Sequence, residues 1–241
     1  MTQTFVLVHG GWHGGWCWHN VEEHLRAAGH RTFAPTLTGL GERSHLHAAV
    51  ESPDTHVTDI VNVIRWNELQ DVILVGHSYA GLIITGVAGQ IPDRIRHLIY
   101  LDAFVPETSG QPTSTWSNPA RAAQIAAARL PDGRIAPSGF DRWVREDTQR
   151  AWLQEMCTPQ PGNCFGKGVT LTGREAEVTR RSYILADHHR PSHFEPFFDC
   201  YARDPAWTTA TVPALHDAMI EAPEALSDLL MDLAGSPTPE P

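Results

Sequence analysis

A short motif around Ser78 constrains this chain most strongly. Residues 72–75 (VILV) form an apolar, β-branched run that predicts a buried strand, and residues 76–80 (GHSYA) follow it directly, ahead of a helix-like stretch. A tight strand-to-helix turn exposes the serine hydroxyl at the edge of a sheet, beside backbone N–H groups of the helix N-terminus. The flanking residues must be small because the two backbones pass close together. Gly76 and Ala80 satisfy this, although the usual pattern has Gly where Ala80 stands. The motif predicts that Ser78 is a nucleophile.

A glycine-rich turn near the N-terminus predicts a second part of the same site. Residues 5–8 (FVLV) indicate another buried strand, and residues 9–16 (HGGWHGGW) come directly after it. A His-Gly-Gly turn in this place can supply one backbone N–H of an oxyanion hole, while the residue after the nucleophile supplies the other. The predicted donors are therefore the backbone amides of Gly11, or alternatively Trp12, and of Tyr79.

A dinucleotide-binding loop is also a glycine-rich turn between a strand and a helix. Its G-x-G-x-x-G spacing is not met here, and Trp12 and Trp16 would crowd a pyrophosphate. The next predicted strand, residues 30–34, leads into Pro35 and not into the acidic residue that would bind a ribose. We therefore expect no cofactor, and a connector without a chemical role is the plain alternative for this turn.

The candidate general base lies near the C-terminus. Residues 208–212 predict the last strand, and a final helix begins near Pro223 with a stripe of leucines on one face. His216 lies on the loop between them, where the chain order Ser, acid, His requires the base. The chain has 14 histidines, and position alone distinguishes His216 from the others.

Composition indicates one domain, residues 1–241, in the cytoplasm. A chain of 241 residues can bury one good core, and the net charge of −10 is spread along the sequence, which argues against nucleic acid or a membrane as partner. No basic leader or apolar run of transmembrane length is visible. In a reducing compartment we expect Cys157 and Cys164 to be free thiols, although they could pair, and Cys17 and Cys200 to pack as small hydrophobic residues.

These segments resemble the α/β-hydrolases, in particular the bacterial group related to plant methyl esterases and hydroxynitrile lyases. The resemblance implies a mostly parallel central sheet with helices on both faces and a small helical cap, and it predicts the fold and the nucleophile better than the substrate. The segments that carry it span nearly the whole chain in the family's order: residues 5–18, 35–46, 72–81, 97–106, 157–161 and 216–226.

In such a fold, the segment of about residues 105–178 is expected to be the cap. It interrupts the alternation of strands and helices, contains an Ala-rich helical stretch at residues 119–129 and carries several aromatic residues. Caps hold much of this fold's variation in specificity, so the rings predict a pocket for a mostly apolar or aromatic substrate, unless they only attach the cap to the core. His13 and Trp12 are expected near the pocket entrance. The tail, residues 235–241, is expected to be disordered.

The acid of the triad stays open between two residues. Relatives place an Asp shortly after the strand that here covers residues 182–185, but a gapless match puts His189 at that position. Asp187 lies two residues early and requires a remodelled turn, whereas Asp102 ends the preceding strand, from which some α/β-hydrolases take their acid. We favour Asp102. Asp217, next to His216, is interpreted as a helix cap.

A metal site is also considered at Asp187, His188, His189 and His193, but Pro191 interrupts the helix that would align them and no ligand set of recognisable spacing appears. We expect no metal.

The predicted reaction is acyl transfer on a small-molecule ester or lactone. Two alternatives remain. In the plant hydroxynitrile lyases a Lys follows the catalytic His and a Thr stands in the oxyanion turn, whereas this chain has Asp217 and Gly11. The lyase is one alternative. The second alternative is a ligand-binding protein with a degenerate triad, since hormone receptors share this fold. The oligomeric state is not predicted, with a homodimer kept open.

Overall fold

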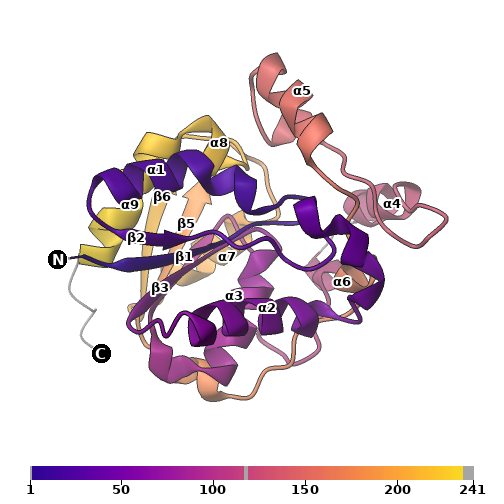
Figure 1. The fold of residues 1–241 in the computed structure, drawn as a ribbon. Helices are drawn as coiled ribbons and strands as arrows, with labels where there is room; N and C mark the ends of the chain where they lie inside the picture. The colour runs from indigo at the N-terminus through magenta and orange to yellow at the C-terminus, as the bar shows by residue number, and fades with distance from the viewer. Residues whose placement is uncertain (1, 117–118, 236–241) are drawn as a thin grey trace.

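A parallel β-sheet organises the molecule. The computed structural model describes residues 2–116 and 119–235, and in this part of the chain the sheet has six strands in the order β2-β1-β3-β4-β5-β6, all parallel (Figure 1). The strands are β1 (Thr4–Val8), β2 (Arg31–Phe33), β3 (Val72–His77), β4 (Ile95–Leu101), β5 (Arg181–Ala186) and β6 (Trp207–Val212). The expected α/β-hydrolase architecture is confirmed.

Helices cover both faces of this sheet. In Figure 1 one layer lies above the strands and another below them. The first layer contains α1 (His19–Ala27), α8 (Ala218–Glu221) and α9 (Pro223–Gly235), and the second contains α2 (Pro53–Trp66), α3 (Ala80–Gln90) and α7 (Glu195–Tyr201). Short 3-10 helices connect the elements at Gly15–Trp18, Gly41–Ala49 and Pro92–Arg94.

Strand β3 shows why the core has two halves. Ile73 and Val75 belong to the cluster that packs under α1 and α9, whereas Val72 and Leu74 belong to the cluster beneath α2 and α3. Successive side chains of a strand point to opposite faces, so a strand buried on both sides is a continuous apolar run. This is the pattern from which residues 72–75 were predicted.

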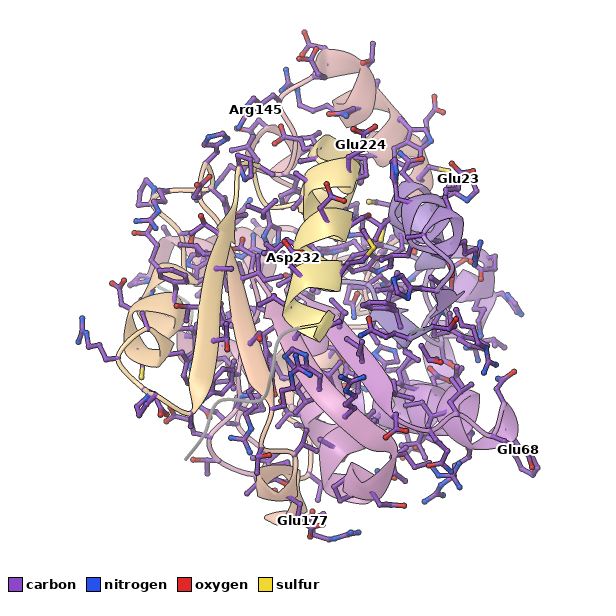
Figure 2. All side chains as sticks on the ribbon, turned by 90° about the vertical axis from the view of Figure 1, so that its left-hand side faces the viewer. Glu23, Glu68, Arg145, Glu177, Glu224 and Asp232 are labelled. Atoms are coloured by element: carbon purple, nitrogen blue, oxygen red, sulfur yellow. The ribbon has the colours of Figure 1, made fainter. Side chains whose placement is uncertain are left out.

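The outer helices follow from local signals. Helix α2 begins after Ser52, whose hydroxyl accepts a hydrogen bond from the Asp54 amide at 3.2 Å, and Pro53 occupies its first turn. In α9, Leu226, Leu230 and Leu233 are buried, as the leucine stripe predicted. Figure 2 places the labelled acids Glu23, Glu68, Glu177 and Glu224 at the surface.

The segment between β4 and β5 lies at one end of the sheet. Figure 1 shows its helices α4, α5 and α6 to the right of the strands. Its elements are Thr113–Trp116, α4 (Pro119–Ala127), Phe140–Arg142, α5 (Asp147–Met156), α6 (Asn163–Gly166) and Arg174–Glu177. Helix α4 matches the expected Ala-rich stretch but ends two residues earlier. Residues 117–118, like most of the tail expected to be disordered (236–241), lie outside the described residues.

The cysteines only partly follow expectation. All four are free thiols, and Cys17, Cys157 and Cys164 are buried. The expectation for Cys200 is wrong: it lies on the exposed side of the short helix α7.

Within residues 2–116 and 119–235, no helix combines the length and the apolar character that crossing a lipid bilayer requires.

Candidate functional site

Ser78 is held at the tip of the turn between β3 and α3. Its φ angle of 54° lies in the left-handed region that side chains other than glycine rarely adopt, and its N–H donates to the Leu101 carbonyl at 3.1 Å. A Cβ on Gly76 would lie 2.8 Å from the Ala80 carbonyl oxygen, so only glycine fits where the strand passes the helix.

Three side chains distant in sequence form one hydrogen-bonded series. Ser78 Oγ lies 3.0 Å from His216 Nε2, and His216 Nδ1 lies 2.6 Å from Asp102 Oδ2. Ser78 follows β3, Asp102 follows β4 and His216 follows β6, so all three project from the carboxyl end of the sheet. This is the edge at which open α/β sheets bind their ligands. The arrangement suits proton transfer from a hydroxyl to an imidazole whose second nitrogen is held by a carboxylate.

Burial sets the charge states in this series. Burial, and next the neighbouring His189, hold the pKa of His216 well below its usual value, although the Asp217 charge acts in the opposite direction. The imidazole is therefore neutral at neutral pH and can accept a proton. Burial raises the pKa of Asp102, and its hydrogen bond from His189 opposes that rise.

The two candidate acids lie in different surroundings. Asp102 is fully buried against His216, while the Asp187 carboxylate lies 3.7 Å from His188 Nε2, and the described contacts include none between Asp187 and His216. Asp187 directly follows β5 and begins the turn after it, and its N–H donates to the Val212 carbonyl at 3.0 Å.

His189 takes the place that the gapless match assigns to an acid. Its Nδ1 lies 2.8 Å from Asp102 Oδ2, the same oxygen that His216 contacts, and the two rings are 4.8 Å apart. One carboxylate thus holds two imidazoles. The sequence singled out the position of His189 but not this contact. The clue in the sequence was that position 189 carries no acid, which implies that a carboxylate from elsewhere holds the candidate base.

Among the candidate oxyanion donors, the Trp12 amide already has an acceptor. The Trp12 N–H donates to Gln160 Oε1 at 2.8 Å. The Gly11 and Tyr79 backbones lie close together, since a Cβ built on Gly11 would be 4.0 Å from the Cβ of Tyr79. Trp12 instead contributes its ring to the pocket, with a φ of 66°. Gly11 and Tyr79 are the backbone pair that fits the expected role.

The Tyr79 side chain fixes the turn from behind. His56 Nε2 faces the Thr38 carbonyl at 2.8 Å and must donate, so His56 Nδ1 accepts from the Tyr79 hydroxyl at 3.0 Å. Burial lowers the pKa of His56 to about 4, which is consistent with this neutral tautomer. The Tyr79 ring is therefore anchored in the core.

His13 and Asp217 form a buried pair behind the site and not at its entrance. His13 Nδ1 lies 2.7 Å from the Gly11 carbonyl and His13 Nε2 lies 3.0 Å from Asp217 Oδ2. Both partners are acceptors, so both ring nitrogens must donate and His13 is an imidazolium. Against the effect of burial, the Asp217 charge raises the pKa of His13, and His13 lowers the pKa of Asp217.

This pair corrects the interpretation of Asp217 as a helix cap. Asp217 occupies the N-cap position of α8, but its side chain makes no capping hydrogen bond. Its neighbour in space, His77, donates from Nε2 to the His216 carbonyl at 3.0 Å, and burial lowers the pKa of His77 to about 3. His77 is therefore a neutral structural neighbour of Ser78. Together these groups hold the loop that carries His216.

Two sets of side chains have atoms close enough for a metal ion. They are His77, His216 and Asp217, and Asp102, His189 and His216, each with ligand atoms within 4.8 Å of one another. Both include His216 Nε2 or Nδ1, atoms that the hydrogen bonds above already engage. The cluster weighed from the sequence at residues 187–193 is not among these sets, which cover the described residues.

A cavity of about 200 Å³ opens onto Ser78 and His216. Aromatic rings line part of it, but Trp143 is the single ring there from the segment expected to be the cap, and basic and small polar side chains also line it. The aromatic lining residues are Trp12, Phe104, Trp143 and Phe194, and the basic ones include Arg121, Arg142, His189 and His193. The pocket is thus more polar than the mostly apolar one that was expected.

Residues 5–229 match the model of the alpha/beta hydrolase family. The chain belongs to this family. The hydrolase is 40% identical to a carbendazim hydrolyzing esterase of Nocardioides sp. (strain SG-4G) over 239 residues, which cover 95% of the chain and 99% of that relative. An alpha-hydroxynitrile lyase of Arabidopsis thaliana is 36% identical over 110 residues, 45% of the chain and 43% of the plant protein.

Solved structures agree with this assignment. A pyrethroid hydrolase from Sphingobium faniae JZ-2 is 25% identical, with a TM-score of 0.76 over 98% of the chain and 99% of its own. An extracellular alpha/beta-hydrolase from a Paenibacillus species, 21% identical, has the same fold, with a TM-score of 0.85 over 97% and 100%. The hydrolase is an esterase-type member of the family, a carboxylic ester hydrolase.

Proposed function

We propose that the hydrolase cleaves a small carboxylic ester or lactone through Ser78, His216 and Asp102. The observation that carries this proposal is the continuous series of hydrogen bonds, 3.0 Å from Ser78 to His216 and 2.6 Å from His216 to Asp102. The substrate class is supported by the esterases among its relatives and by a cavity of about 200 Å³, which suits a small molecule.

In the proposed acylation, Ser78 Oγ attacks the carbonyl carbon as its proton passes to His216 Nε2. The Asp102 carboxylate stabilises the imidazolium, and the Gly11 and Tyr79 amides donate to the oxyanion. Collapse of the tetrahedral intermediate breaks the bond to the leaving alcohol, which takes the proton from His216. Water then attacks the acyl-enzyme while giving a proton to His216, and that proton returns to Ser78 Oγ as the acid leaves.

The two alternatives lack support from the site. Asp217 stands where the resembling lyases have Lys, and it faces His13 behind the site instead of the cavity. A binding protein with a degenerate triad was suggested by the missing acid after β5, but Asp102 supplies a carboxylate to His216 from β4.

The test is covalent labelling. A fluorophosphonate should add to Ser78 alone, as peptide mass spectrometry would locate, and Ser78→Ala should lose both labelling and turnover of a p-nitrophenyl ester while keeping its melting temperature. Label on another residue, or undiminished turnover in Ser78→Ala, would refute the proposed nucleophile. Cyanide release from mandelonitrile without ester turnover would favour the lyase.

A further inference from the structure

The cavity above Ser78 carries an excess of positive charge. Two guanidinium groups, Arg121 and Arg142, line it together with His193. Within the described residues that line the cavity there is no carboxylate side chain. Asp102 lies beneath it, fully buried, and is engaged by His216 and His189. The described lining of the cavity is therefore basic.

Arg121 is placed over the floor of the cavity. Its Cζ lies 5.6 Å from the centroid of the Trp12 ring, a cation–π geometry, and its Nη1 donates to Gln124 Oε1 at 3.0 Å. Trp12 follows Gly11, one of the two proposed oxyanion donors. Burial, and next the nearby Arg142, lower the pKa of Arg121. An anion bound here would offset both effects, because a negative charge favours the protonated guanidinium.

Arg142 is fixed beside the candidate base. Its Nη2 donates to the Pro191 carbonyl at 2.8 Å, and its own carbonyl accepts a hydrogen bond from the His216 amide at 3.5 Å. The next residue, Trp143, stacks on Trp12 with ring centroids 5.5 Å apart. Arg121 and Arg142 thus approach the same aromatic wall from α4 and from the short 3-10 helix Phe140–Arg142.

We infer that this cavity binds an ester whose remaining part carries a carboxylate, held by Arg121 and Arg142 while Ser78 attacks the ester carbonyl. This inference rests on the proposed function and names the substrate class of the same site. Guanidinium groups match carboxylates in shape and form charge-assisted, often bidentate hydrogen bonds. The small cavity requires the two groups to be a few bonds apart, as in a monoester of a short dicarboxylic acid.

The experiment compares two substrates of similar size. Mono-p-nitrophenyl glutarate carries the carboxylate, and p-nitrophenyl pentanoate does not. The readout is the ratio of their kcat/KM values in the wild type, in Arg121→Gln and in Arg142→Gln. Losing a hydrogen bond to a charged group should lower this ratio by about 10- to 150-fold in each variant. Added salt should lower the wild-type ratio as well, because screening weakens attraction between charges.

Arg174→Gln is the matched control. It removes the same charge from an exposed arginine that pairs with Glu177, which Figure 2 places at the opposite end of the molecule from Arg145. The ratio should not change in this variant. An equal fall in Arg174→Gln would assign the effect to the overall field and overturn the inference, as would an unchanged ratio in both cavity variants.

Binding is measured separately so that the two proposals can fail independently. Ser78→Ala protein is titrated with the monoester by tryptophan fluorescence, which Trp12 and Trp143 report. We expect the monoester to bind at least tenfold more tightly than the neutral ester, and this preference to vanish when Arg142→Gln is added. Binding with this preference but no wild-type turnover would reject only the esterase mechanism. Turnover of both esters with no binding preference would reject only the carboxylate site.

Discussion

Replacing Asp217 by Asn should destabilise the hydrolase strongly, because it leaves the buried cation of His13 without its partner. The His13 ring lies between the Gly11 carbonyl and the Asp217 carboxylate, and both His13 and Asp217 are almost completely buried. Removing one member of a buried pair typically costs about 3–5 kcal/mol. For a chain of this size each kcal/mol lowers Tm by about 2–4 °C, so we expect a fall of about 6–20 °C.

The pH dependence of this loss has a definite sign. The lowered pKa of Asp217 means that its contribution is present above its unfolded value of 3.8 and is lost as pH falls through the lower folded value. The raised pKa of His13 means that its contribution is complete below its unfolded value of 6.5 and is lost as pH rises through the higher folded value. The difference in Tm should therefore be largest at about pH 5–6 and should shrink on the alkaline side.

The assay is thermal unfolding followed by circular dichroism for the wild type, Asp217→Asn, His13→Gln and the double variant. The double variant should lose less than the sum of the single losses, since no charge is left unpaired. Asp228→Asn, on the exposed side of α9, is the control and should leave Tm nearly unchanged. A Tm for Asp217→Asn close to that of the wild type at about pH 6, or a deficit that grows with rising pH, would refute the assignment of an ion pair.

Two further predictions concern the site. His189 lowers the pKa of His216, so His189→Gln should raise that pKa. Because the base acts only when neutral, the acid limb of the pH profile of kcat/KM should then move to higher pH. An unmoved limb would show that the two rings are not coupled. Gly76→Ala should cost about 1–3 kcal/mol, because its Cβ would lie 2.8 Å from the Ala80 carbonyl oxygen, and unchanged urea denaturation would argue against so tight a turn.

The sequence predicted those features that depend on local pattern. Residues 72–75 are apolar and β-branched, which identifies a strand buried on both faces, and the small residues beside Ser78 identify the turn that follows. His216 was found from its place between the last strand and the last helix. In parallel sheets the carboxyl ends of strands share one edge, so chain order alone brought Ser78 and His216 to the same region.

The remaining features depend on contacts between distant residues. His13 and Asp217 are 204 positions apart, and neither charge pattern nor periodicity connects them. Whether Asp102 or Asp187 reaches His216 depends on how the chain turns after β5, a conformation that no residue type there determines. Arg121 and Arg142 lie in the irregular segment between β4 and β5, where the sequence predicted aromatic packing but not the basic cavity wall.

The most direct test of the proposed relay is to measure kcat for a p-nitrophenyl ester in Asp102→Asn and Asp187→Asn side by side. An amide at position 102 cannot hold His216 in the tautomer that accepts the serine proton, so kcat should fall by about 10⁴-fold, while Asp187→Asn should stay near the wild type. Wild-type kcat in Asp102→Asn, or a comparable loss in Asp187→Asn alone, would contradict the account.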